Sequence, residues 1–239
     1  KEIMETNPQV LADMTLLLKP VFKELDLALH CSQNSIYHYT DVLHHTLDAM
    51  SYLKPYDETL AFALLFHDLG KVQVKTTDSK GKDHFKHHAM VGSELSKELC
   101  RRFKLTNDQR KWIPFYVLHH DDKFTCDLDC IYKYRITYNL DEEHLLKLLQ
   151  IRYCDAMAHS ELGQKSAVDV ESFYDYYIQN RNRCMSISQL ALNGKDIIEA
   201  TNLRGKQIQE ALKMCLKYSF YNPEKNNKKD LLNILKNEL

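Results

Sequence analysis

The residues with the clearest chemical potential in this sequence are histidines and aspartates that follow one another in an ordered series. Of the 12 histidines in 239 residues, several stand beside another histidine or a carboxylate. The series is His45, the pair His67-Asp68, His88, the pair His119-His120, and Asp155. Neutral imidazole and carboxylate are ligands of divalent transition metals. The series therefore predicts a mixed nitrogen and oxygen metal site.

The adjacent pair His67-Asp68 is the most informative part of the series. A single histidine is more often a surface residue or a hydrogen-bonded core residue than a ligand. This pair, however, ends a stretch, residues 58–69, that is apolar almost all round and predicts a central buried helix. Burying a carboxylate there without a counter-charge is costly, and a metal ion would supply that charge.

Composition and spacing predict that helices position these residues. Gly (6) and Pro (5) are scarce, which argues against a turn-rich β architecture. Apolar residues recur at helical spacing, and Gly70 is a natural helix stop. We expect Pro20 to start a second helix inside residues 10–29, and residues 72–85 to form a loop. The expected helices are 39–53, 58–69, 88–103, 107–120, 128–138, 141 to beyond 155 and 205–218, and residues 226–239 are a Lys- and Asn-rich end with a Leu-Leu-x-x-Leu stripe. The predicted fold class is all-α.

Bulk properties narrow the class of protein. The formal net charge is −1, so no overall basic field indicates nucleic acid. Seven scattered cysteines, an odd number, predict a reducing, cytoplasmic compartment rather than a disulfide framework. No apolar run is long enough to span a bilayer, and no signal peptide is present, so we expect no membrane partner. The sequence begins at Lys1 rather than Met, and we expect a fragment of a longer protein.

The segment AFALLFHDLGK (residues 61–71) resembles the signature of the HD phosphohydrolase superfamily. The ordered pattern H…HD…H…H…D around it strengthens the resemblance. It implies an HD-domain helical bundle in which His45, His67, Asp68 and Asp155 hold a divalent metal. His88 and His120, with His119, would serve a second metal or the substrate phosphate, and Asp68 would bridge two metals. The resemblance implies one or two ions per site and does not distinguish Mg, Mn, Ni, Co, Fe or Zn.

Neighbouring histidines leave a choice of ligand. Adjacent residues on a helix point about 100° apart, so His44 and His45 cannot both face one site. The match to the motif favours His45, and the same logic favours His88 over His87, which stays a further candidate. His38 lies on the helical face of His45 and is another candidate, although a surface histidine at a helix start fits equally well.

The resemblance also implies a chemistry for Asp68 and Lys71. In HD proteins a lysine at the position of Lys71 lies near the substrate phosphate, whereas a solvated surface lysine is the alternative. Water activated by the metal would attack phosphorus, and Asp68 is placed to take its proton.

Several longer stretches are similar to bacterial tRNA nucleotidyltransferases (CCA-adding enzymes, of the poly(A) polymerase family). These are NSIYHYTDVLHHTLDAM (34–50), HFKHHAMVGSELSKELCRRFKLTND and LALNGKDIIEATNLRGKQIQEAL (190–212). The similarity predicts an HD metal-binding domain over residues 1–165 and a smaller C-terminal helical region over 166–239. Those enzymes also carry a nucleotidyltransferase head with a Gly-Ser turn and a D-x-D pair. Asp127-Leu128-Asp129 lacks that context and predicts a helix start, so we do not expect this chain to add nucleotides.

Three functions remain open at this stage. The first is a metal-dependent phosphohydrolase acting on nucleotide phosphomonoesters or cyclic phosphodiesters. The second is a tRNA-binding body without catalysis, and the third is a regulatory HD protein for signalling nucleotides. Basic side chains that could track an RNA backbone, or form a solvated face, are Arg101, Arg102, Lys104, Arg110 and Lys111. The sequence leaves the oligomeric state undetermined.

Overall fold

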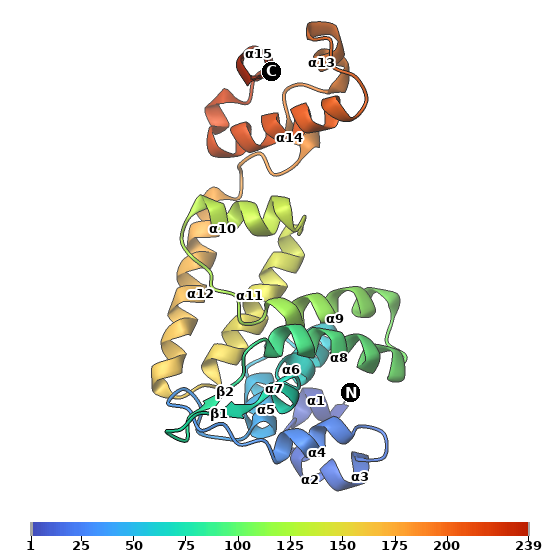
Figure 1. Cartoon of the computed structure of the whole chain (residues 1–239), viewed down its shortest axis with the longest axis vertical. Helices are drawn as coiled ribbons and strands as arrows, with labels where there is room; N and C mark the ends of the chain where they lie inside the picture. Colours follow the sequence, from blue (N-terminus) through green and yellow to red (C-terminus); the bar gives the residue numbers. More distant parts are fainter. Residues whose placement is uncertain (1, 239) are drawn as a thin grey trace. The chain divides into compact units, whose positions relative to one another are not determined.

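The computed structural model describes residues 2–238, whose regular secondary structure is almost wholly α-helical and which form two compact units (Figure 1). The first unit contains the chain up to Phe124 together with Leu146–Ser172, and the second contains Thr125–Leu145 together with the chain from Phe173 onward. The predicted all-α fold class is confirmed. The domain boundary between residues 165 and 166 stays a prediction. Within the described residues, no helix is long and apolar enough to cross a membrane.

The first unit is built around one central helix. Its helices are α1 (Glu2–Thr6), α2 (Val10–Asp13), α3 (Thr15–Leu18), α4 (Lys23–Leu29), α5 (Val42–Ser51), α6 (Glu58–His67), α7 (Lys71–Val74), α8 (His88–Arg102) and α9 (Asn107–His119). The helices α11 (Glu142–Met157) and α12 (Glu161–Asn180) each contribute residues to both units. As the apolar sequence of residues 58–69 predicts, α6 is buried almost throughout, and it packs against α5, α8 and α9. Its last residue is His67.

The N-terminal segment corrects one expectation, because Pro20 lies in a turn and does not start a helix. The next helix, α4, begins at Lys23, after Phe22, whose backbone is not helical, with φ −146° and ψ 64°. The ring of Phe22 is buried, 6.0 Å from the ring of Phe66 and 5.0 Å from that of Phe103, both edge-on. The turn at Pro20 therefore delivers an aromatic side chain to the core.

The expected loop 72–85 is wrong in part, because it contains α7 and a small antiparallel hairpin. The strands β1 (Thr76–Thr77) and β2 (Asp83–His84) pair Thr76 with His84 and Thr77 with Asp83. The Asp83 carboxylate accepts hydrogen bonds from the Asn34 N–H and the Thr77 hydroxyl, and it pairs with Lys75 at 2.9 Å. The Asn34 N–H above all, then Lys75 and Thr77, lowers the pKa of Asp83 to about 2. This carboxylate orders the hairpin against residues 31–35.

Two glycines allow α8 to approach the end of α6. A Cβ on Gly70 would lie 2.2 Å from the backbone oxygen of His88 and 2.6 Å from the backbone nitrogen of Gly92. A Cβ on Gly92 would lie 3.3 Å from the backbone oxygen of His67. This close backbone contact brings the start of α8, with His88, beside the end of α6, with His67 and Asp68.

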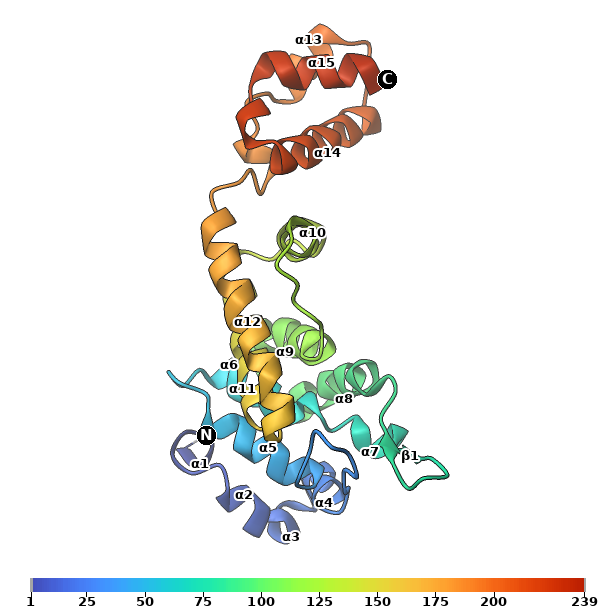
Figure 2. The ribbon, with the colours of Figure 1, turned by 90° about the vertical axis from the view of Figure 1, so that its left-hand side faces the viewer.

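The second unit has an apolar core of its own. Besides the ends of α11 and α12 it contains α10 (Leu128–Tyr132), the π-helical turn η1 (Lys133–Thr137), the 3-10 turns η2 (Ile187–Gln189) and η3 (Pro223–Lys225), α13 (Gly194–Ala200), α14 (Lys206–Tyr221) and α15 (Lys228–Glu238). Figure 2 shows α14 and α15 side by side. Their buried cluster is Leu192, Ile197, Ala211, Leu212, Cys215, Leu231 and Leu235. As predicted, Asp127 caps a helix start, where its carboxylate accepts from the Cys130 N–H.

Candidate metal centre

Four imidazoles near the end of α6 make the same kind of contact, from Nδ1 to a backbone carbonyl oxygen. The Nδ1 atoms of His45, His67, His88 and His120 lie 3.3, 2.6, 2.9 and 2.7 Å from the backbone oxygens of Ala158, Leu64, Phe85 and Val117. A carbonyl only accepts, so each Nδ1 carries a proton and donates, and Nε2 is the nitrogen left to bind a cation. Backbone contacts of this kind fix the tautomer of metal-ligating histidines. All four side chains therefore present Nε2 toward the centre. Burial opposes the charge of His67, but Asp68 and Asp155 outweigh it and raise the pKa of this imidazole, whose Nε2 binds a metal in exchange for its proton.

The first group of acceptors joins α5, α6 and α11. His45 Nε2 lies 2.9 Å from Asp155 Oδ1 and 3.6 Å from Asp68 Oδ2. His67 Nε2 lies 3.5 Å from Asp155 Oδ1 and 3.4 Å from Asp68 Oδ2. These four side chains are almost completely buried. Two imidazole nitrogens and two carboxylate oxygens therefore face one another in this group.

The second group uses the other oxygen of Asp68. Asp68 Oδ1 lies 3.5 Å from His88 Nε2 and 3.6 Å from His120 Nε2, and the two nitrogens are 3.2 Å apart. His88 comes from the start of α8 and His120 from the end of α9. Asp68 thus stands between both groups, with one oxygen facing each.

The donor set fits divalent metal ions. Acceptors at these separations repel one another unless a proton or a cation lies between them. His67 Nε2 and Asp68 Oδ1 are buried and take part in no hydrogen bond with the described residues, whereas Asp68 Oδ2 has the Lys71 ammonium beside it at 2.6 Å. Two ligand bonds of about 2.1 Å meeting at a tetrahedral or octahedral angle place the ligand atoms about 3.0–3.5 Å apart. The observed separations run from 2.9 to 3.6 Å and so lie within about 0.1 Å of that range, and the residues fit one ion in each group.

Charges around the centre keep both carboxylates ionised. Burial acts to raise the pKa of Asp68, but the nearby Lys71 and His67 outweigh it and hold the pKa well below its usual range. Burial likewise acts to raise the pKa of Asp155, which His159 and His45 hold well below its usual range. Ionised carboxylates are the form that binds metal.

Lys71 is buried beside Asp68 and is not a solvated surface lysine. Its Nζ lies 2.6 Å from Asp68 Oδ2, donates to Gln33 Oε1 at 2.8 Å and lies 3.5 Å from His38 Nε2. The Phe85 ring centroid is 5.4 Å from the same nitrogen. A fixed cation therefore stands at the edge of the metal-binding groups.

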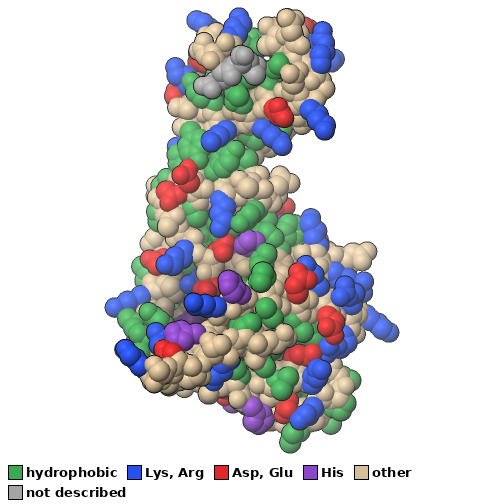
Figure 3. Space-filling view, in the orientation of Figure 1, with side chains coloured by type: hydrophobic (Ala, Val, Ile, Leu, Met, Phe, Trp, Pro, Cys, Tyr) green, Lys and Arg blue, Asp and Glu red, His purple; other side chains and the backbone are tan. Residues whose placement is uncertain are grey.

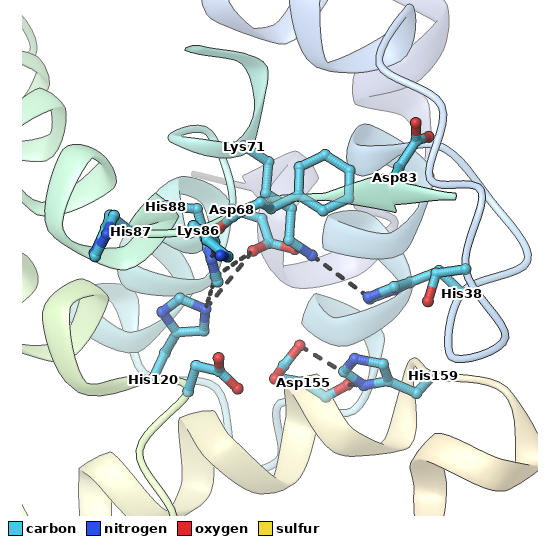
Figure 4. A pocket seen from close by; sticks show the side chains of 13 residues that line it. His38, Asp68, Lys71, Asp83, Lys86, His87, His88, His120, Asp155 and His159 are labelled. Atoms are coloured by element: carbon cyan, nitrogen blue, oxygen red, sulfur yellow. Dashed lines mark hydrogen bonds and ion pairs between the residues drawn. The ribbon is translucent and has the colours of Figure 1, made fainter. Parts of the chain in front are cut away.

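A pocket of about 390 Å³ opens onto these residues (Figure 4). Its wall contains Asp68, Lys71, His88, His120 and Asp155, and also Phe85, Lys86 and His159. Small-molecule sites start at about this size. Figure 3 shows histidine side chains exposed on this face, with Lys and Asp or Glu side chains beside them. The pocket can thus admit a small anionic ligand to the centre.

The structure places the remaining candidate ligands differently. His119 turns its Nδ1 toward Asp122 Oδ2 at 3.0 Å. His87 lines the pocket but is exposed and has a left-handed backbone, with φ 65°. Among the described residues, neither belongs to a group of potential ligands, whereas His38 does, together with His45 and His159. Burial, with Lys71 and the other two imidazoles, lowers the pKa of His38 to about 2, so it is neutral.

His159 is the one histidine lining this pocket that was not predicted from the sequence. It follows α11 and donates from Nδ1 to the backbone oxygen of Asp155 at 2.7 Å. Its ring lies 4.8 Å from that of His45 and 4.4 Å from that of His38. The available signal was its place four residues after Asp155, one helical turn away.

The basic residues predicted to contact RNA lie at the joined ends of α8 and α9. Figure 3 shows Lys and Arg side chains gathered there. Arg102 already pairs with Glu24 at 2.9 Å and Glu98 at 2.7 Å. Lys111 lies over the Trp112 ring, 4.2 Å from its centroid. Arg101, Lys104 and Arg110 are exposed, and RNA contact by this set stays a prediction.

Comparisons with known proteins agree with the geometry. The sequence model described as "HD domain" matches residues 36–158, a range that contains every residue of both ligand groups. The chain is similar to the Multifunctional CCA protein of Xylella fastidiosa strains M12 and 9a5c, with 27% identity over 208 residues in each case. The match covers 82% of this chain and 46% of each relative. The chain therefore spans about half the length of the curated relatives it matches.

Proposed function

We propose that this chain, which belongs to the HD domain family, is a metal-dependent phosphohydrolase for nucleotide phosphomonoesters or cyclic phosphodiesters. The observation that carries the proposal is the position of Asp68, with one oxygen toward each pair of imidazole Nε2 atoms and the Lys71 ammonium alongside. A site that holds cations next to a fixed ammonium, inside a small pocket, suits a substrate that carries a phosphate group.

We assign different roles to different residues of the site. In our proposal His45, His67, Asp68 and Asp155 hold one ion, and Asp68, His88 and His120 hold a second. A bound divalent ion lowers the pKa of water and neutralises phosphoryl oxygens. The Lys71 ammonium donates to a phosphoryl oxygen, and Asp68 keeps lone pairs that accept a proton from the attacking water. The donor set suits Mn, Fe, Co, Ni or Zn, and Mg through its carboxylates, without selecting one.

The test is turnover by the metal-loaded chain against a panel of nucleotide phosphates. The panel contains 2′-, 3′- and 5′-monophosphates and 2′,3′- and 3′,5′-cyclic phosphates, each with Mg, Mn, Co or Ni. We expect turnover of at least one substrate, abolished by Asp68→Ala and retained by His84→Ala, a control on the exposed hairpin. Absence of turnover with all four metals, or turnover that survives Asp68→Ala, contradicts the proposal. Elemental analysis of His67→Ala measures metal loss separately.

A second function, tRNA binding, is supported by two observations. One is the similarity to the Multifunctional CCA protein over most of the chain. The other is charge: from residue 181 to 237, Lys and Arg clearly outnumber Asp and Glu, and Figure 3 shows basic side chains around α13, α14 and α15. Clustered cations of this kind contact nucleic-acid phosphates.

A titration with tRNA and with an unrelated RNA of equal length, at moderate and high salt, tests tRNA binding. Three double charge reversals locate the surface: Lys213→Glu with Lys217→Glu on α14, Arg101→Glu with Arg110→Glu on α8 and α9, and Lys80→Glu with Lys82→Glu as the control. All six side chains are exposed. We expect the α14 pair to weaken binding most. Equal affinity for both RNAs, or equal effects of all three pairs, would rule out specific tRNA binding by these surfaces.

A further inference from the structure

His159 has the same internal arrangement as the four proposed ligand histidines, without a place in either ligand group. Its Nδ1 donates to the Asp155 backbone oxygen at 2.7 Å, so its Nε2 keeps a lone pair. The residue lines the pocket, and its contacts with the Asp155 backbone and carboxylate, among the described residues, are made by Nδ1 and leave Nε2 open. A neutral acceptor therefore faces the space next to the metal centre.

The ring of His159 is held rigidly. A Cβ on Gly163, in the first turn of α12, would lie 2.4 Å from the Cβ of His159, so the helix packs directly on this side chain. The next residue, Ser160, donates its N–H to Tyr37 O at 2.9 Å and its hydroxyl to Ile36 O at 2.8 Å. These contacts fix His159 in place beside the loop that carries His38. An acceptor fixed in this way can discriminate between ligands.

A third metal ion is a poor occupant for this position, although His38, His45 and His159 bring potential ligand atoms within 4.8 Å of one another. His45 has one lone pair, at Nε2, and that nitrogen faces Asp155 and Asp68. Only His38 and His159 would remain as ligands. In addition, the Lys71 ammonium lies 3.5 Å from His38 Nε2 and would repel a cation there.

A hydroxyl group is the complementary occupant. Lys71 offers hydrogen-bond donors, which suit a phosphate, whereas His159 Nε2 offers an acceptor, which suits an O–H donor. His38 contacts both, with its Nε2 3.5 Å from the Lys71 Nζ and its ring 4.4 Å from the His159 ring. Figure 4 shows Lys71, His38 and His159 along one side of the pocket. One imidazole, that of His38, thus separates a position suited to a phosphate from a position suited to a hydroxyl. A ribonucleotide with a 2′- or 3′-phosphate carries such a pair of groups, on neighbouring carbons of the ribose.

We propose that His159 Nε2 accepts a hydrogen bond from the substrate hydroxyl next to the phosphoester, and that the site thereby prefers ribonucleotides to deoxyribonucleotides. The inference rests on the proposed phosphohydrolase function and assigns His159 a positioning role. A neutral hydrogen bond of this kind is expected to give a preference of about two- to tenfold in kcat/KM.

The experiment compares adenosine 3′-monophosphate with 2′-deoxyadenosine 3′-monophosphate, using the metal-loaded full chain. The readout is the ratio of the two kcat/KM values in one protein, because any general loss of activity cancels in it. We expect a ratio of about two to ten in the natural chain and close to one in His159→Leu. His159→Gln, which keeps an acceptor, should retain part of the preference. His84→Leu, on the exposed hairpin, should retain all of it.

Further measurements separate the alternatives. Gly163→Ala, which displaces the His159 ring without removing it, should lower the ratio as well and serves if His159→Leu does not fold. A ratio near one in the natural chain, or a ratio unchanged in His159→Leu, overturns the inference. Loss of metal from His159→Leu, measured by elemental analysis, would show that His159 is a ligand instead. If neither nucleotide is hydrolysed, calorimetric affinities for the two nucleotides provide the same ratio, and turnover of the other members of the nucleotide panel decides separately whether the proposed function fails.

Discussion

The two compact units of this chain have buried interiors of opposite character. The interior of the first contains an ionic cluster that includes Asp68, Lys71 and Asp155, beside its apolar core. The described cluster of α13, α14 and α15 contains only apolar side chains and one cysteine. Buried charges contribute less to folding stability than apolar side chains of similar size. The difference indicates that the first interior is arranged for binding and the second for stability. Substitutions in each interior can test these two roles separately.

The largest expected effect is the loss of activity on removing one proposed metal ligand. His44 and His45 are neighbours on α5, but His45 is 1% exposed whereas the His44 side chain is 42% exposed and pairs with Asp41 at 2.6 Å. We expect His45→Ala to lower kcat/KM by roughly a thousandfold, because the ion contributes several kcal/mol. His44→Ala should stay within a few-fold. If His45→Ala and His44→Ala lowered activity and bound metal equally, His45 would not be the ligand that α5 contributes.

The second prediction concerns the apolar interior. Leu231 is completely buried on α15, whereas its neighbour Leu232 is only partly buried. Leu231→Ala should lower the free energy of unfolding by about 2–5 kcal/mol, since it removes a side chain and leaves a cavity. Metal bound per folded chain should not change. Chemical denaturation and elemental analysis measure the two quantities, and a smaller effect is expected for Leu232→Ala. Metal loss in Leu231→Ala would contradict the separation of roles.

The third prediction compares two glycines, one in each unit. A Cβ on Gly70 would collide with backbone atoms of α8, whereas a Cβ on Gly194 would meet only Ile208 Cγ2, at 3.4 Å. Gly70→Ala should therefore lower the free energy of unfolding by about 1–3 kcal/mol and weaken metal binding, because the ends of α6 and α8 move apart. Gly194→Ala should change stability by less than about 1 kcal/mol. Tight metal binding by Gly70→Ala would show that the helix contact does not position the centre.

The sequence predicted the parts of the site that depend on residue type and order. His67-Asp68 stood out because an ionisable pair ended an apolar helix, and that helix is found at residues 58–67. His159 was missed because its role depends on a tautomer fixed by the Asp155 backbone and on the approach of Gly163. The hairpin at residues 76–84 was missed because strands of two residues carry no periodicity. The turn at Pro20 was missed because it depends on the packing of Phe22 against Phe66 and Phe103. Local helix propensity contains no information on contacts between residues so distant in sequence.

The smallest expected effect concerns His87, a candidate ligand that the structure places at the pocket wall in a left-handed conformation. Lys104, at the end of α8, shares that conformation, with φ 53° against 65° for His87. Such a backbone costs a non-glycine residue about 1 kcal/mol, so both His87→Gly and Lys104→Gly should stabilise the fold by up to that amount in thermal unfolding. Only His87→Gly removes a pocket side chain, and it should lower kcat/KM a few-fold while bound metal stays constant. Loss of metal in His87→Gly would instead show that His87 is a ligand. An unchanged kcat/KM would show that the His87 side chain and its left-handed backbone have no role in catalysis.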